Sequence, residues 1–153
     1  MPDILHRVGA VAPIESVYRA IATPDGVAAW WTQDTHGSDA IGGSITTSFT
    51  NPDTGDHLGG FTLNNAELVA GKRVAWRVTD GPDEWMNTLI SFDLTQEGDY
   101  TIVNFAHEGW REPVEFMAHC STKWATFLMS LKSFVETGSG QPSPDDVRIG
   151  NWH

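Results

Sequence analysis

Residues 113–137 read PVEFMAHCSTKWATFLMSLKSFVET and decide the fold. At 100° per residue, the large apolar side chains of this stretch fall in one arc about 120° wide, and polar side chains, including His119, occupy the opposite face. Pro113 suits the first turn of a helix and Gly138 suits a C-cap, so we predict a helix of about 24 residues, about 36 Å long. Its apolar face must pack against another layer. That face consists of Phe116, Met117, Cys120, Trp124, Phe127, Leu128, Leu131, Phe134 and Val135.

The composition is that of one globular domain. The chain has 153 residues, of which 40% are hydrophobic and 19% charged, and a formal net charge of −11. Such an acidic chain is repelled by phosphate backbones and anionic bilayer surfaces, so no nucleic-acid partner is expected. The sequence has no signal-peptide pattern and no stretch of about 18 apolar residues that would span a membrane, so a cytoplasmic location is expected.

The segments before this helix alternate between apolar and polar residues with a period of two, which is typical of strands. Short Gly-, Pro-, Asn- and Asp-containing turns separate them, and such short connections require antiparallel pairing. Nearer the N-terminus, Ile4–Val11 predicts one more strand, followed by two short helices, the second capped at Thr23-Pro24. The strands expected after these helices are Ser44–Thr50, Leu58–Val69, Arg73–Thr79, Trp85–Thr95 and Tyr100–Glu108.

This order predicts an α+β protein with a helix-grip fold, in which an antiparallel sheet curves around the long C-terminal helix. The chain resembles the START-like superfamily, also called SRPBCC, and within it the family homologous to the activator of the heat-shock-protein ATPase. The resemblance covers residues 4–138 and rests on APIESVYRAI (12–21), TPD (23–25), WW (30–31), TIVNFAHEGW (101–110) and WATFLMSLKSF (124–134). It implies six strands after the short helices, so a further short strand is expected between Thr32 and Gly43.

We predict one domain over residues 1–138 and a tail over residues 139–153 that is rich in Ser, Gly, Pro and Asp. Ile149 and Trp152 are unusual in a disordered end. The tail is therefore expected to dock on the domain or on a second copy of the chain, and a homodimer is one expected assembly.

The candidate binding site is the space between the sheet and the long helix. His107 shares strand parity with Phe105 and should face the apolar interior, either as a satisfied core histidine or as a polar anchor or acid/base in a pocket. Cys120, the only cysteine, is expected to be a buried structural thiol. Four of the seven tryptophans, Trp85 among them, are expected around this space, as core filling or as cavity wall. The predicted ligand contacts are Trp76, Phe92, Phe105, His107, Trp110, Met117, Cys120 and Trp124.

The sequence carries no known catalytic motif, so no catalytic residue, cofactor or metal ligand is assigned. Two clusters, at residues 34–39 and 53–57, combine Asp with His, but in Gly-rich loops of an acidic chain such residues are expected to be solvated. The leading hypothesis is binding of a small hydrophobic or aromatic molecule. A cyclase- or hydrolase-like enzyme with His107 as acid/base stays open, and so does a co-chaperone-like domain acting in a stress response, which the resemblance implies.

Overall fold

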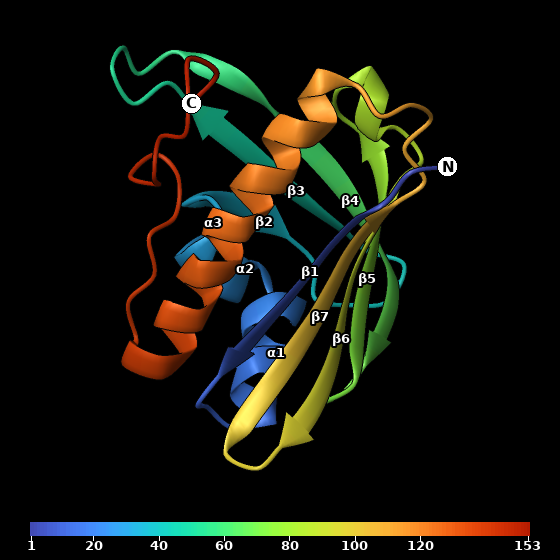
Figure 1. The fold of residues 1–153 in the computed structure, drawn as a ribbon, viewed down its shortest axis with the longest axis vertical. Coiled ribbons are helices and arrows are strands. Elements are labelled where there is room, and N and C mark those ends of the chain that lie inside the picture. Colours follow the sequence, from blue (N-terminus) through green and yellow to red (C-terminus); the bar gives the residue numbers. More distant parts are fainter.

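The computed structural model describes residues 1–153 and has a seven-stranded antiparallel sheet that curves around one long helix (Figure 1). The strand order is β1-β7-β6-β5-β4-β3-β2, so the first strand pairs with the last. This confirms the predicted helix-grip fold. The elements are β1 (Ile4–Ala10), α1 (Ile14–Ala22), α2 (Pro24–Trp30), β2 (Asp34–Gly37), β3 (Ser44–Thr50), β4 (His57–Val69), β5 (Arg73–Asp80), the 3-10 turn η1 (Asp83–Trp85), β6 (Leu89–Glu97), β7 (Tyr100–Glu108) and α3 (Glu115–Thr137).

The apolar face of α3 lies against the sheet in the predicted phase. Trp124, Leu128 and Leu131 are buried in the core, whereas Met129, one residue from Leu128, leaves 54% of its surface exposed. Gly138 ends the helix with a φ of 87°, and its N–H donates to the carbonyl of Phe134 at 2.8 Å. In Figure 1, α3 runs in nearly the same direction as β1 and β7 and crosses the direction of β3 and β4.

Of the two helix starts predicted from proline positions, that of α2 is correct and that of α3 is wrong. The Thr23 hydroxyl accepts a hydrogen bond from the Gly26 N–H at 3.1 Å, which confirms the predicted cap of α2. The prediction that Pro113 lies in the first turn of α3 is wrong, because the helix begins at Glu115 with Val114 as its N-cap. Val114 has no side chain that can accept a hydrogen bond from the first turn, so no capping residue in the sequence marks this start.

The strand predictions fail at one place. Trp85 does not begin a strand but ends the turn η1, and β6 starts only at Leu89. Pro82 precedes the turn, and Asn87 adopts a positive φ of 65°, a backbone conformation in which Asn is more frequent than most residues. The expected short strand after Thr32 is confirmed as β2.

Strand β4 carries the irregularities that bend the sheet. Its pairing with β5 shifts register at two places, and such bulges increase local twist and curvature. Near its start, Gly60 passes so close to β3 that an added Cβ would lie 2.0 Å from the Thr47 carbonyl oxygen. Only glycine fits there, and the following residue, Phe61, is thereby held over the inner face of the sheet.

After α3, the tail turns back and runs beside the helix toward the β3–β4 hairpin (Figure 1). Ser143 is buried and forms a parallel bridge with Thr32, in which its N–H donates to the Trp31 carbonyl at 2.8 Å. Ile149 is half-buried, and Trp152 leaves 48% of its surface exposed. The domain boundary at residue 138 stays a prediction. No helix of the structure is long and apolar enough to cross a bilayer.

Candidate ligand pocket

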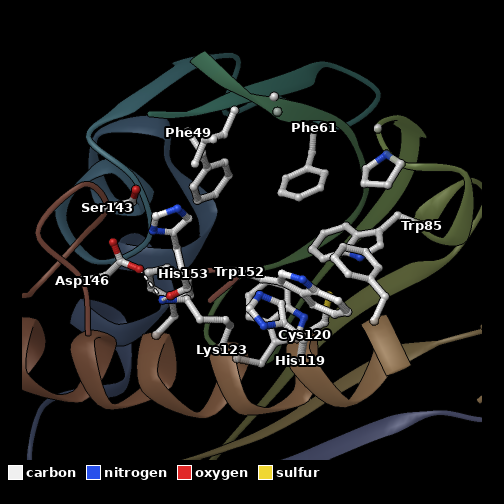
Figure 2. Close-up of a pocket in the computed structure, with 18 of the residues that line it drawn as sticks. Phe49, Phe61, Trp85, His119, Cys120, Lys123, Ser143, Asp146, Trp152 and His153 are labelled. Atoms are coloured by element: carbon white, nitrogen blue, oxygen red, sulfur yellow. Dashed lines mark hydrogen bonds and ion pairs between the residues drawn. The ribbon is translucent and has the colours of Figure 1, made fainter. Parts of the chain in front are cut away.

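A pocket of about 590 Å³ lies between the β3–β4 hairpin, helix α3 and the tail. Figure 2 shows Phe49 and Phe61 reaching from the strands toward the helix, with Trp85 at one end and the tail residues Asp146 and His153 at the other. The space is therefore enclosed by three parts of the chain that are distant in sequence. Only the tail wall lies outside the predicted domain.

Aromatic rings form most of the apolar wall of the pocket. Phe61 stacks on Trp85 with ring centroids 4.0 Å apart and planes 6° from parallel. Trp85 in turn stacks on Trp124, at 5.9 Å and 22°, and Phe49 meets Phe61 edge-on at 5.5 Å. Flat rings in this arrangement offer a surface suited to a planar or aliphatic molecule.

The turn η1 places Trp85 in this wall. The Trp85 N–H donates to the Pro82 carbonyl at 2.9 Å, and the Thr88 N–H donates to the Trp85 carbonyl at 3.0 Å, so the backbone is fixed on both sides of the ring. Cys120 lines the pocket beside this ring and is buried, as predicted. Burial raises the pKa of the Cys120 thiol to about 12, so the group stays protonated and unreactive at neutral pH.

Lys123 is the only lysine or arginine of α3 that lines the pocket. It is only 13% exposed, and its ammonium group lies 5.0 Å from the centre of the Phe127 ring. The ammonium pairs with the Asp146 carboxylate and donates to the main-chain oxygens of Val147 at 2.7 Å and His153 at 3.1 Å. All three acceptors belong to the tail.

His119 was predicted to be exposed on the polar face of α3, and that prediction is wrong. The ring is half-buried, lines the pocket and meets Trp152 edge-on at 5.5 Å. Burial, and then the positive charge of Lys123, lower the pKa of His119. The tail shields His119 from solvent, although the position of this residue on the helix predicts exposure.

His107 faces the interior, as its strand parity predicted, but it lies outside the pocket. The ring is 0% exposed. Its Nδ1 accepts the indole N–H of Trp124 at 3.2 Å, and its Nε2 lies 2.8 Å from the Thr88 hydroxyl, which donates to the Trp85 carbonyl at 2.6 Å. An indole can only donate, so Nδ1 carries no proton and Nε2 donates to Thr88. Burial lowers the pKa of His107 to about 3, and the ring is neutral with both nitrogens used.

Two of the eight predicted ligand contacts, Cys120 and Trp124, line the pocket. Met117 is half-buried and lies outside the lining. The remaining five are buried in the core away from the pocket, namely Trp76, Phe92, Phe105, His107 and Trp110. The list of ligand contacts stays a prediction, since the structure contains no bound molecule.

Trp30, the last residue of α2, and Trp31, its C-cap, fill part of the predicted binding space, beneath β5 and β6. Trp31 lies parallel to Trp76 with centroids 5.8 Å apart, and Trp30 meets Phe92 edge-on at 6.1 Å. The interior therefore stays open only on the β3–β4 side. The sequence analysis missed Phe49, Phe61, His119, Lys123 and the tail residues as lining groups.

The two acidic loop clusters do not assemble into a metal site. His36 pairs with Asp34 at 2.8 Å, and Asp53 pairs with Arg148 of the tail at 2.6 Å. No group of three His, Cys, Asp or Glu side chains comes together in a way that could hold a metal ion.

Comparisons with known proteins agree with this architecture. Residues 11–136 match the family model described as Activator of Hsp90 ATPase homolog 1-like protein. The solved structure of the Aha1 dimer from Colwellia psychrerythraea is 40% identical, with a TM-score of 0.78, and the match covers 92% of this chain and 100% of that chain. No curated protein matches the chain.

More distant solved structures share the fold. Protein CV1439 from Chromobacterium violaceum is 22% identical, with a TM-score of 0.71, over 89% of this chain and 99% of its own. CalU16 from Micromonospora echinospora is 18% identical, with a TM-score of 0.70, over 93% of this chain and 69% of its own. At these identities the likeness concerns the fold alone.

Proposed function

Since the chain belongs to the family of Activator of Hsp90 ATPase homolog 1-like proteins, we propose that it uses the helix-grip fold to bind a small apolar or aromatic molecule between sheet and helix. The observation that carries this proposal is the pocket of about 590 Å³ walled by Phe61, Trp85 and Trp124. Pockets of this size bury most of a small ligand, and mostly apolar walls with a few polar groups are typical of them.

The shape of the core supports this site over any other in the fold. Elsewhere between sheet and helix, the two tryptophans at the C-terminal end of α2 fill the interior, so a ligand there would have to displace Trp30 or Trp31. In the pocket, a ligand meets ring faces that are already ordered by stacking on one another. Binding to such a surface costs little side-chain ordering.

The test uses the neutral fluorophore N-phenyl-1-naphthylamine, whose emission rises in apolar surroundings. We expect saturable binding to the wild-type chain. His119→Trp places a large ring into the pocket and should weaken binding about tenfold or more. Thr122→Trp is the matched control, because Thr122 lies on the exposed side of the same helix. Equal affinities of the two variants would show that the probe binds elsewhere.

An acid/base role for His107 has less support. A general base must reach the proton it takes, within a hydrogen bond or through one water. His107 is fully buried, both ring nitrogens are bonded, and the ring does not line the pocket. Ligand binding requires no proton transfer by His107, and we therefore favour a binding function over a cyclase- or hydrolase-like activity.

We also propose that the chain forms a homodimer. The support is the 40% identity to a protein whose solved structure is a dimer, over the full length of that chain. Light scattering after size exclusion should give the mass of two chains at micromolar concentration. The mass of one chain across a hundredfold concentration range would contradict the proposal.

Activation of a heat-shock ATPase is a second candidate function, favoured by the family description that residues 11–136 match. It predicts that the chain raises the rate of ATP hydrolysis by Hsp90 from the same organism. An unchanged rate at saturating concentration would exclude it. The pocket proposal is independent of this outcome.

A further inference from the structure

The tail satisfies a buried charge that belongs to the pocket. The Lys123 ammonium has three N–H donors, and its acceptors are Asp146, Val147 and His153. The Asp146 side chain is as shielded as that of Lys123, at 15% against 13% exposed. Asp146 and His153 also line the pocket, and Figure 2 shows both beside Lys123.

The tail is held in two unequal parts. Residues 141–143 are fixed to the domain: the Gln141 N–H donates to the Ser130 hydroxyl at 2.7 Å, and Ser143 accepts from the Gln33 N–H at 3.0 Å. Beyond them, residues 146–153 attach to the domain through hydrogen bonds at Lys123, through the edge-on contact of Trp152 with His119 and through the exposed ion pair of Arg148 with Asp53. Exposed ion pairs contribute little to stability, and Trp152 leaves 48% of its surface exposed, so Lys123 is the main polar attachment of this segment.

The charge at Lys123 limits what can replace the tail. A neutral molecule that took the place of residues 146–153 over Lys123 would cover the ammonium group without supplying an acceptor, and a buried charge without a partner is strongly unfavourable. A molecule with an acid group would restore the ion pair that Asp146 makes. Asp80, the other acidic residue in the lining, is exposed and forms no ion pair with Lys123.

We propose that the pocket takes small aromatic or aliphatic acids, with the apolar body on the ring wall and the carboxylate or sulfonate on Lys123, in place of residues 146–153. This inference rests on the proposed binding function and names its ligand class. The tail then competes with the ligand, and Asp146 is the residue that the acid group replaces. Local pairing selects an anion here in spite of the net charge of −11.

Two probes with the same ring system test the ligand class. 1-Anilinonaphthalene-8-sulfonate carries an acid group, and N-phenyl-1-naphthylamine does not. Asp146→Asn weakens the competitor and should tighten sulfonate binding about threefold to tenfold, clearly more than it changes the affinity for the neutral probe. Lys123→Met should weaken sulfonate binding about tenfold or more, a clearly larger loss than for the neutral probe.

Asp145→Asn is the matched control. It removes the same charge from the neighbouring tail residue, whose carboxylate reaches only Gln33 at 3.5 Å, and should change neither affinity. Equal responses of the two probes to Asp146→Asn would overturn the inference and leave the pocket in place. If neither probe binds the wild-type chain, the proposed function itself fails. Should Lys123→Met not fold, the response to Asp146→Asn decides alone.

Discussion

The interior between sheet and helix has two halves, and a buried polar group finds its hydrogen-bond partners in a different part of the chain in each. In the closed half, beneath β5–β7, His107 is enclosed by Trp85, Thr88 and Trp124 and bonds only to neighbours within the domain. In the open half, beneath β3 and β4, Lys123 bonds only to the tail. A group satisfied by the core stabilises the fold, whereas a group satisfied by a chain end can exchange its partner.

The largest expected effect lies in the closed half. Leu131 is 1% exposed, so Leu131→Ala should lower the free energy of unfolding by about 2–5 kcal/mol through the cavity it leaves. Met129→Gln, on the outer side of the same helix, should cost less than about 1 kcal/mol. Denaturant unfolding measures both. Comparable losses at the two positions would mean that the helix faces the sheet differently.

His107→Gln tests whether the closed half is structural. Glutamine cannot accept from Trp124 and donate to Thr88 in the same geometry, so we expect a loss of about 1–3 kcal/mol in stability. Affinity of the pocket for N-phenyl-1-naphthylamine should stay within about twofold, because His107 does not line it. A large loss of affinity with little loss of stability would place His107 in the binding site instead.

The wild type and His107→Gln should also differ in how their free energy of unfolding depends on pH. The pKa of His107 is about 3 in the folded chain, well below its ordinary value of 6.5. Between these values the unfolded state binds the additional proton, so the stability that His107 contributes is complete above pH 6.5 and declines as the pH falls toward 3. From pH 7 to pH 4.5, the free energy of unfolding of the wild type should fall by about 2.5 kcal/mol relative to that of His107→Gln. An imidazole that titrates near pH 6.5 by NMR would contradict this.

Removal of the tail after Gly138 should have the smallest effect on stability. It exposes the site occupied by Ser143 and leaves Lys123 without its acceptors, and we expect a loss of about 1–2 kcal/mol in the free energy of unfolding, or about 2–8 °C in melting temperature. Light scattering on the same samples shows whether the tail also supports a dimer. If melting temperature and mass are both unaltered, residues 139–153 form no part of the folded domain.

The sequence predicted the fold better than the pocket, for a physical reason. Periodicity determines which face of an element a residue occupies, and it placed Leu131 inward and Met129 outward correctly. The same periodicity correctly predicted that His107 faces the interior. It cannot say whether the facing volume is already filled, and here Trp31 occupies the space beneath Trp76.

The lining residues that the sequence analysis missed depend on contacts between distant segments. Trp85 was expected around the space between sheet and helix, but its place in the wall depends on a turn that replaces the first residues of the predicted strand. Lys123 and His119 are shielded because the tail folds back over them. The pair of Ile149 and Trp152 did signal an ordered tail, but no sequence pattern indicated that Asp146 would meet Lys123.

The pairing of the first strand with the last also has a kinetic meaning. Ile4 lies opposite His107, so β1 has no partner until the ribosome has released β7. Synthesis proceeds at about 5–20 residues per second, so β1 remains without a partner for about 5–20 s after it is made. Closing such a long loop is slow compared with forming local helices, so β1 docks late, together with the helix that follows β7. The two ends of the domain thus complete it in one step.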